Sequence, residues 1–143
     1  MTTPTVSFGQ TLAFAERTLT EVLRRHLAER DTTPETWYAL QLIGTRGPGL
    51  ARDALTRDLA TSRTLNADST RELLAQLAAD GLIRGDANVD LTTEGETLFQ
   101  NLRQYVAGPT VRLLGQFNPE DIDTTMRTLQ AITAKAAEEL AVR

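Results

Sequence analysis

The sequence GLIRGDANVDLTTEG, residues 81–95, has the pattern of a small β-hairpin enclosed by two helices. Residues 82–83 and 89–91 are short apolar runs that fit two strands, and the Gly85-Asp86 pair between them is typical of a turn. At ~3.3 Å per residue each arm of the hairpin extends about 10 Å. The segment therefore predicts a short hairpin between two helices.

Six helices are predicted around this hairpin, because apolar residues recur at three- and four-residue spacing between capping and breaking residues. Asn66 is an expected N-cap, and a capping box is expected from Thr93 to Glu96. Gly108-Pro109 is expected to interrupt the fifth helix, because proline has no backbone N–H to donate. The predicted helices cover residues 8–30, 34–43, 50–62, 67–80, 93–107 and 119–141.

The order of these elements indicates a mainly α fold with a small β-hairpin wing, the winged helix-turn-helix. Its long first and last helices carry more apolar surface than one small core covers, so we expect them to pack against a second copy of the chain. A length of 143 residues corresponds to a single domain. We assign residues 1–143 to one domain, with a winged helix-turn-helix at 33–107, a recognition helix at 67–80, a wing at 82–91 and dimerisation helices at 8–30 and 110–142.

The composition excludes several kinds of functional site. The chain has no Cys and one His, which removes disulfides, thiol nucleophiles and cysteine-rich zinc sites. The sequence shows neither the pattern of a Ser-His-Asp triad nor that of a phosphate-binding loop, so we expect no enzymatic activity, no cofactor and no metal. No apolar run approaches the ~18 residues of a membrane span, and no signal pattern is present. We therefore expect no membrane partner and a cytoplasmic location.

Four segments resemble, in the same order, the MarR family of bacterial transcriptional regulators. TTPETWYALQLIGTRGPG (32–49) resembles the second-helix signature of the family, and LNADSTRELLAQLAADGLI (65–83) resembles its recognition helix and the exit into the wing. VDLTTEGETLF (89–99) is similar to the returning strand of the wing, and GQFNPEDIDTTMRTLQAI (115–132) to the start of the last helix. Together the four segments span residues 32–132, most of the chain.

The resemblance implies a DNA-binding regulator that works as a homodimer. In that family the first and last helices join the two subunits, the recognition helix enters the major groove, and the wing touches the minor groove or the backbone. Small molecules often bind between the dimer helices and the DNA-reading part and release the DNA. We therefore expect a homodimer on double-stranded DNA, at a pseudo-palindromic operator with half-sites about one helical turn apart, modulated by a small-molecule effector.

The predicted recognition helix presents an acidic side to the DNA. Its outward side, which a major-groove helix uses for base contacts, is centred on Asp68 and Glu72. Both acids stabilise the positive end of the helix macrodipole in the interpretation that we favour, and Glu72 has the alternative of accepting a hydrogen bond from cytosine N4. The residues expected to contact DNA are Arg57, Arg63, Asn66, Ser69, Arg71, Gln76 and Arg84.

The predicted wing carries little positive charge for a DNA contact. The MarR family typically has a longer hairpin with an Asp-x-Arg step whose arginine reaches the minor groove, and this hairpin has no such arginine. Arg84, at its base, is its only cation, and it either contacts a phosphate or pairs with Asp86 or Asp90. We expect the wing to act as a structural brace, so that DNA binding falls to Arg71 and to the arginines that precede the recognition helix. These are Arg46, Arg52, Arg57 and Arg63.

Four residues are candidates for an effector pocket. His26 lies on the apolar stripe of the first helix, where it is either a core or interface histidine or a residue that responds to ligand or pH. Trp37 is expected in the core and Tyr38 in the pocket wall. Arg17 either offers charge to an anionic ligand or pairs with Glu21 one turn later. The candidate effector residues are therefore Arg17, His26, Trp37 and Tyr38.

A second hypothesis belongs to a different class of function. The acidic side of the recognition helix, the short wing and a net charge of −4 also fit a winged-helix dimer with reduced or lost DNA binding, which acts as a protein-interaction or ligand-binding module. Salt-dependent binding to DNA discriminates between the two hypotheses, because a specific complex with several phosphate contacts weakens steeply as salt rises.

Overall fold

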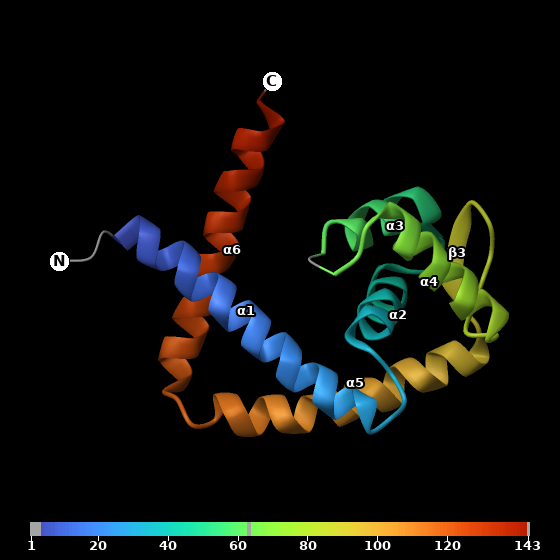
Figure 1. Cartoon of the computed structure of the whole chain (residues 1–143), viewed down its shortest axis with the longest axis horizontal. Helices are drawn as coiled ribbons and strands as arrows, with labels where there is room; N and C mark the ends of the chain where they lie inside the picture. Colours follow the sequence, from blue (N-terminus) through green and yellow to red (C-terminus); the bar gives the residue numbers. More distant parts are fainter. Residues whose placement is uncertain (1–3, 63, 143) are drawn as a thin grey trace. The chain divides into compact units, whose positions relative to one another are not determined.

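The computed structural model describes residues 4–62 and 64–142. Within these residues the chain forms six helices and three short strands (Figure 1), which confirms a mainly α fold with a small β wing. The helices are α1 (Pro4–Ala28), α2 (Pro34–Arg46), α3 (Arg52–Ala60), α4 (Ala67–Ala79), α5 (Thr93–Leu114) and α6 (Pro119–Ala141), and the strands are β1 (Leu50–Ala51), β2 (Ile83–Arg84) and β3 (Asn88–Leu91).

The chain divides into two compact units, Met1–Val106 and Ala107–Arg143. The first unit holds α1 to α4, the three strands and most of α5, and the second holds the end of α5 and all of α6. None of the described residues of α6 is buried. The hydrophobic core that positions the candidate site therefore belongs to the first unit.

The three strands form one antiparallel sheet in the order β1-β3-β2. Ile83 of β2 pairs with Leu91 of β3, which confirms the predicted hairpin. Leu50 of β1 pairs with Val89 on the other edge of β3. The wing is therefore joined to the segment that leads directly into α3.

The third strand corrects the prediction of a helix over 50–62. Residues 50–51 are extended, and α3 begins only at Arg52. Gly49 has a φ of 74°, a left-handed conformation that favours glycine and turns the chain toward the wing. Pairing with β3 gives residues 50–51 interstrand hydrogen bonds, whereas the first turn of a helix leaves its N–H groups without an intrahelical acceptor.

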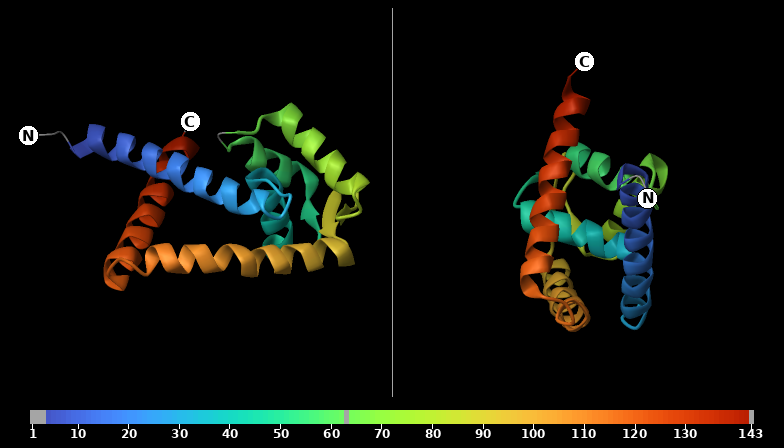
Figure 2. Two further views of the ribbon diagram at one scale, coloured as in Figure 1. Left: turned by 60° about the horizontal axis from the view of Figure 1, so that its bottom comes forward. Right: turned by 90° about the vertical axis from the view of Figure 1, so that its left-hand side faces the viewer.

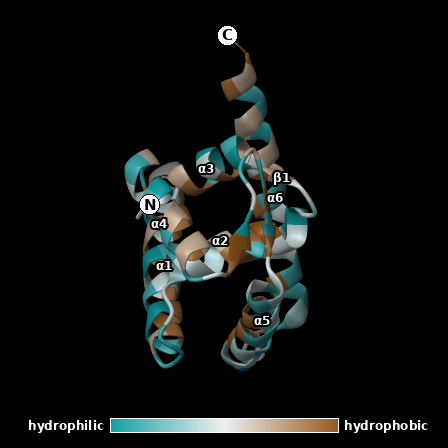
Figure 3. Ribbon diagram, turned by 90° about the vertical axis from the view of Figure 1, so that its right-hand side faces the viewer, coloured by the Kyte–Doolittle hydropathy of each residue, from teal (hydrophilic) through white to brown (hydrophobic). Residues whose placement is uncertain are grey.

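Two adjoining hydrophobic clusters form the core of the first unit. One lies between α2, α3, α4 and the sheet, and the other joins α1, α2 and α5. Figure 2 shows α4 running beside α3, and in Figure 3 hydrophobic parts of α2 lie next to the sheet. The buried residues of the first cluster are Ala39, Ile43, Leu55, Leu59, Leu74, Leu77, Ile83 and Val89, and those of the second are Leu27, Trp37, Leu40, Phe99 and Leu102.

The start of α5 closes the base of the wing. Thr92 rather than Thr93 caps the helix, so the predicted capping box from Thr93 to Glu96 is wrong. The Thr92 hydroxyl accepts from the N–H of Gly95 at 3.0 Å and donates to the carbonyl of Gly81 at 2.5 Å. The Thr92 N–H donates to the carbonyl of Leu82 at 3.0 Å. A Cβ on Gly95 would lie 1.9 Å from that carbonyl oxygen, so only glycine permits this approach.

Helix α5 continues through Pro109, so the predicted interruption there is wrong. The helix extends to Leu114 with the proline inside it. Proline lacks the N–H that would donate to the carbonyl four residues earlier, but a helix can continue past one missing hydrogen bond when the turns on both sides are formed.

Glu35, in the first turn of α2, connects α1 to the loop before α4. Its Oε2 accepts hydrogen bonds from the Thr64 hydroxyl at 2.5 Å and from Arg24 Nη2 at 3.4 Å. Burial by itself raises the pKa of Glu35, but the hydrogen bonds from Thr64, from its own backbone N–H and from Arg24 outweigh burial and lower the pKa below its ordinary value of 4.5. Ionised Glu35 therefore stabilises the junction of α1, α2 and this loop.

We expect Glu35→Gln to lower the free energy of unfolding by about 1.5 kcal/mol at pH 7, the scale of a hydrogen bond to a charged group. Because the folded state lowers the Glu35 pKa, the advantage of the wild type is complete above pH 4.5 and disappears as the pH falls through the lower, folded pKa. Urea denaturation of both proteins from pH 7 to pH 3 measures whether their free energies of unfolding converge as the pH falls. The control is Glu21→Gln, which removes an exposed carboxylate that lies 3.8 Å from Arg24. A constant difference between wild type and Glu35→Gln across this range would contradict the assignment.

Thr70, on the inner side of α4, is fully buried, and its hydroxyl has no hydrogen-bond partner among the described residues. Because a buried hydroxyl without a partner costs free energy, we expect Thr70→Val to raise the free energy of unfolding by about 1 kcal/mol. Thr56→Val is the matched control, because the Thr56 hydroxyl donates to the carbonyl of Arg52 at 2.9 Å and its removal loses a bond. Equal destabilisation of the two variants in urea denaturation would show that the Thr70 hydroxyl is satisfied.

Candidate nucleic-acid interface

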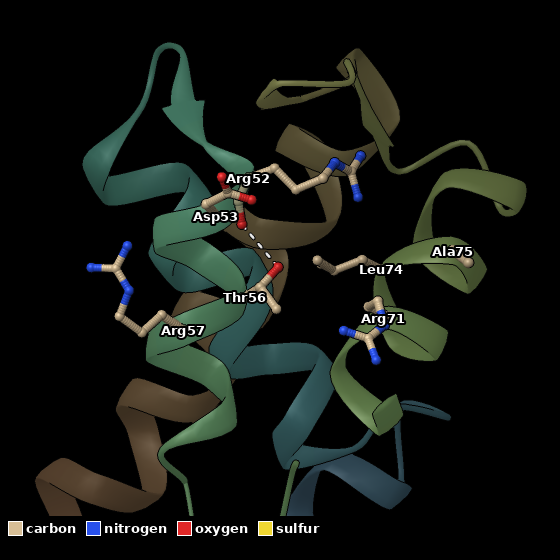
Figure 4. Close-up of a pocket in the computed structure, with 7 residues that line it drawn as sticks. All are labelled: Arg52, Asp53, Thr56, Arg57, Arg71, Leu74 and Ala75. Carbon is tan, nitrogen blue, oxygen red and sulfur yellow. Dashed lines mark hydrogen bonds between the residues drawn. The ribbon is translucent and has the colours of Figure 1, made fainter. Parts of the chain in front are cut away.

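Helices α3 and α4 pack together and leave a surface groove of about 520 Å³ between them. Figure 4 shows Leu74 pointing from α4 toward α3, whereas Arg52 and Arg57 leave α3 in different directions. The groove therefore has an apolar floor and cationic edges. Its lining residues are Arg52, Asp53, Thr56, Arg57, Arg71, Leu74 and Ala75.

The N-terminus of α4 is closed by a reciprocal cap. The N–H of Ser69 donates to Asn66 Oδ1 at 2.8 Å, and the N–H of Asn66 donates to Ser69 Oγ at 2.9 Å. The predicted N-cap at Asn66 is thus confirmed, with Ser69 as its partner. Both residues were also expected to contact DNA, and the cap places them at the exposed start of the helix.

The outward side of α4 is exposed and largely paired within the helix. Arg71 forms an ion pair with Asp68, and the Gln76 amide donates to Asp80 at 2.9 Å. Glu72 is exposed and has no ion-pair partner among the described residues. The Arg71 side chain is 64% exposed, and an ion pair so open to water contributes at most about 1 kcal/mol. A phosphate or a base edge can therefore compete for Arg71.

The arginines before α4 have different surroundings. Arg46 forms an ion pair with Asp58, across α2 and α3. Arg57 is exposed and makes no ion pair within the part of the chain that the structure describes. Arg63 lies outside the described residues. Arg57 therefore has no ion-pair partner among the described residues that a phosphate would need to displace.

Arg52 reaches the turn of the wing, a placement that sequence reasoning missed. Its Nε donates to the carbonyl of Asp86 at 2.7 Å and its Nη2 to that of Gly85 at 3.0 Å. The partners lie 34 and 33 residues along the chain, so no local sequence signal identifies them. The expectation that Arg52 simply meets phosphate is therefore incomplete, because two of its donors already bind the wing.

The base of the wing is held from its other side by an acid. Asp90 Oδ1 accepts from the N–H of Gly49 at 2.6 Å. Arg84 stands opposite Asp90 in the β-ladder, but its guanidinium forms no ion pair with any described residue. The alternative in which Arg84 pairs with Asp86 or Asp90 is therefore not what the structure shows, and Arg84 is exposed at the wing.

Two of the candidate effector residues lie on α1. Arg17 is exposed, and the expected partner Glu21 instead lies 3.8 Å from Arg24. His26 is half-buried, and its ring meets the ring of Tyr105 edge-on at 6.5 Å between centroids. The Tyr105 hydroxyl also donates to the backbone carbonyl of His26 at 2.8 Å.

The other two candidates lie on α2. Trp37 is 6% exposed and stacks on Phe99 at 5.9 Å between ring centroids, in agreement with the expected core position. Tyr38 is half-buried and packs against both core clusters. The structure therefore places Trp37 and Tyr38 in or beside the core, while the polar groups of Arg17 and His26 remain accessible from α1.

Within residues 4–62 and 64–142 no three acidic or histidine side chains are grouped so that they could hold a metal ion. No helix in the same residues combines the length and the apolar character that are needed to cross a membrane.

The sequence matches no model of a known protein family and no curated protein. The structure, however, is similar to many solved structures. The Mycobacterium tuberculosis MarR family protein Rv2887 in complex with DNA has 18% sequence identity and a TM-score of 0.69, over 87% of this chain and 95% of that chain. Rv2887 has also been solved in complex with salicylic acid.

Two other regulators are similar over nearly their whole length. Ligand-free NadR has 22% identity and a TM-score of 0.74, over 92% of this chain and 98% of that chain. Staphylococcus aureus MepR in its DNA-binding conformation has 18% identity and a TM-score of 0.69, over 90% and 98%. The arrangement of α3, α4 and the three-stranded wing sheet is thus the winged helix, and the chain has the fold of the MarR family of transcriptional regulators.

Proposed function

We propose that the chain is a DNA-binding transcription regulator that binds a pseudo-palindromic operator as a homodimer, with α4 in the major groove. The observation that carries this proposal is the α3–α4 pair: α4 is capped at Asn66 and buried along its inner side, and it exposes Arg71 and Gln76. The same fold binds DNA in Rv2887, which was solved as a DNA complex. The chain would then regulate transcription rather than catalyse a reaction.

The proposed contacts divide into base reading and backbone positioning. Arg71 and Gln76 are the base-reading candidates, because both reach out from the exposed side of α4 and their side chains match the hydrogen-bonding edges of guanine and adenine. Contacts to phosphate fix the register of a protein on the duplex without reading its sequence. The candidates for such contacts are Arg57, Arg63, Asn66, Ser69 and Arg84.

The homodimer is supported by apolar side chains that neither unit covers. On α1, Phe14 is 67% exposed and Leu19 51%. In the second unit, Val111 is 69% and Leu140 80% exposed. Exposed apolar surface on this scale marks an interaction site. A second copy of the chain is the expected partner, because most soluble oligomers are symmetric homo-oligomers.

A small-molecule effector is the remaining part of the proposal. Rv2887 binds salicylic acid in one of its solved structures, so a small aromatic acid is a reasonable class of ligand for this fold. Arg17 and His26 on α1 carry the accessible polar groups that suit an anion, and half-buried Tyr38 on α2 would add an aromatic ring. Trp37 contributes to the core in this assignment.

A second candidate function is a winged-helix dimer with reduced DNA binding that acts as a protein-interaction or ligand-binding module. The exposed Glu72 favours it, together with the ion pair that occupies Arg71. An unpaired acid on the outward side of α4 repels a polyanion and partly cancels the attraction of the arginines.

Salt-dependent binding separates the two candidates. We expect the purified dimer to bind a duplex containing the DNA that flanks its own gene, and to lose about 10³-fold in affinity between 50 and 200 mM salt if six or so phosphates are neutralised. Fluorescence anisotropy measures the slope. A folded dimer that binds none of this DNA at 50 mM salt would support the second candidate.

Substitutions of Arg71 and of its partner Asp68 should change DNA affinity in opposite directions. We expect Arg71→Ala to weaken specific binding by about 1–3 kcal/mol, the range for a base-contacting arginine. Asp68→Asn should strengthen binding, because it frees Arg71 and removes a like charge from the path of the phosphates. Arg103→Ala is the control, since Arg103 is exposed on α5 and belongs to neither the proposed DNA contacts nor the proposed dimerisation helices. Unchanged anisotropy titrations for both α4 variants would remove Arg71 from the interface.

A further inference from the structure

One residue of α3 binds three consecutive carbonyls of the wing turn. The guanidinium of Arg52 donates to the carbonyls of Gly85 and Asp86 at 3.0 and 2.7 Å. The backbone N–H of Arg52 donates to the carbonyl of Ala87 at 2.8 Å. Because Arg52 is the first residue of α3, these bonds tie the wing turn to the N-terminus of that helix.

The shape of the turn explains why its carbonyls face α3. Gly85 has a φ of 107°, a conformation that other residues rarely adopt. A Cβ at this position would lie 2.0 Å from the carbonyl oxygen of Asn88. Gly85 and Asn88 therefore approach each other closely within the turn, and the carbonyls of residues 85–87 are available to a donor from outside the hairpin.

Arg52 keeps donors free after these contacts. A guanidinium has five N–H donors in a fixed planar fork, and the two wing carbonyls take one from Nε and one from Nη2. Arg52 is half-exposed and lines the groove that also contains Arg57 and Arg71. Its positive charge thus lies beside a wing turn whose own residues 85–88 include no cation.

We propose that Arg52 is the positioning residue of the wing: it fixes the turn at 85–88 against α3 and supplies the cation through which the wing meets a DNA phosphate. This inference rests on the proposed DNA-binding function and specifies how one part of that interface is built. The phosphate contact is then made at a fixed distance from α4, because α3 packs against both α4 and the sheet. Lysine cannot replace Arg52, because a single ammonium group does not reproduce the planar two-carbonyl fork.

The test compares Arg52→Lys and Arg52→Gln with Arg57→Lys and Arg57→Gln. Arg57 is the matched control because it lies on the same helix, is exposed and binds no wing carbonyl among the described residues. The first measurement is amide hydrogen exchange of residues 84–91 in the free, full-length protein. We expect both Arg52 variants to exchange these amides about tenfold faster, as the loss of hydrogen bonds from a charged donor implies, and both Arg57 variants to match the wild type.

The second measurement is hydroxyl-radical footprinting on a duplex that the wild type selects from a random-sequence library. We expect Arg52→Lys and Arg52→Gln to lose protection at the outer, wing-side phosphates and to keep it over the sequence read by α4. In salt titrations of DNA affinity, Arg57→Gln should reduce the slope of log affinity against log salt by the amount expected for about one phosphate contact. Arg57→Lys should restore the slope, because a phosphate contact needs only the charge.

Each outcome has a distinct meaning. Wild-type exchange and wild-type footprints for Arg52→Lys would overturn the inference, since charge alone would then be sufficient. Faster exchange with an unchanged footprint would overturn the DNA part of it. If the wild type selects no duplex, the proposed function fails, and the phosphate contact fails with it, while the exchange data still decide whether Arg52 holds the wing. Circular dichroism melting of every variant identifies any that does not fold.

Discussion

The pairing of Leu50 with Val89 is the interaction on which the winged helix of this protein depends. Without it the wing would be a two-stranded ribbon of two and four residues, and an isolated hairpin of that size is marginal in water. With it, Val89 is completely buried in the cluster that also holds α3 and α4. A strand of only two residues thus brings the wing and both helices onto one core.

Local signals predicted most of the helices, and distant partners account for what they missed. Asn66 and Gly81 mark the ends of α4 because a cap and a left-handed glycine act within a few residues. The strand at 50–51 depends on β3, nearly forty residues later, so its apolar residue was assigned to the following helix. Pro109 does not end α5, since a proline ends a helix only when the flanking turns do not hold it.

The candidate interface shows the same division. The exposed side of α4 followed from helical periodicity alone, and the structure agrees that Thr70, Leu74 and Leu77 face inward. Helical periodicity did not predict which arginines form ion pairs. Arg46 is matched by Asp58 and Arg71 by Asp68. The proposed DNA binding would exchange these internal partners for phosphates, so part of the electrostatic gain would be offset before the complex forms.

The closed base of the wing gives the hairpin a degree of independence. Thr92 joins its own end of the hairpin to Gly81 and Leu82 at the other end, so the exit from α4 and the entry to α5 are held together without help from the turn. Wings of different length can therefore be exchanged on one scaffold, much as loops of different length are grafted onto a fixed framework. In this protein the exchangeable module is not continuous in sequence: a transplanted wing would have to carry residue 52 with it, because Arg52 completes the turn from outside the hairpin.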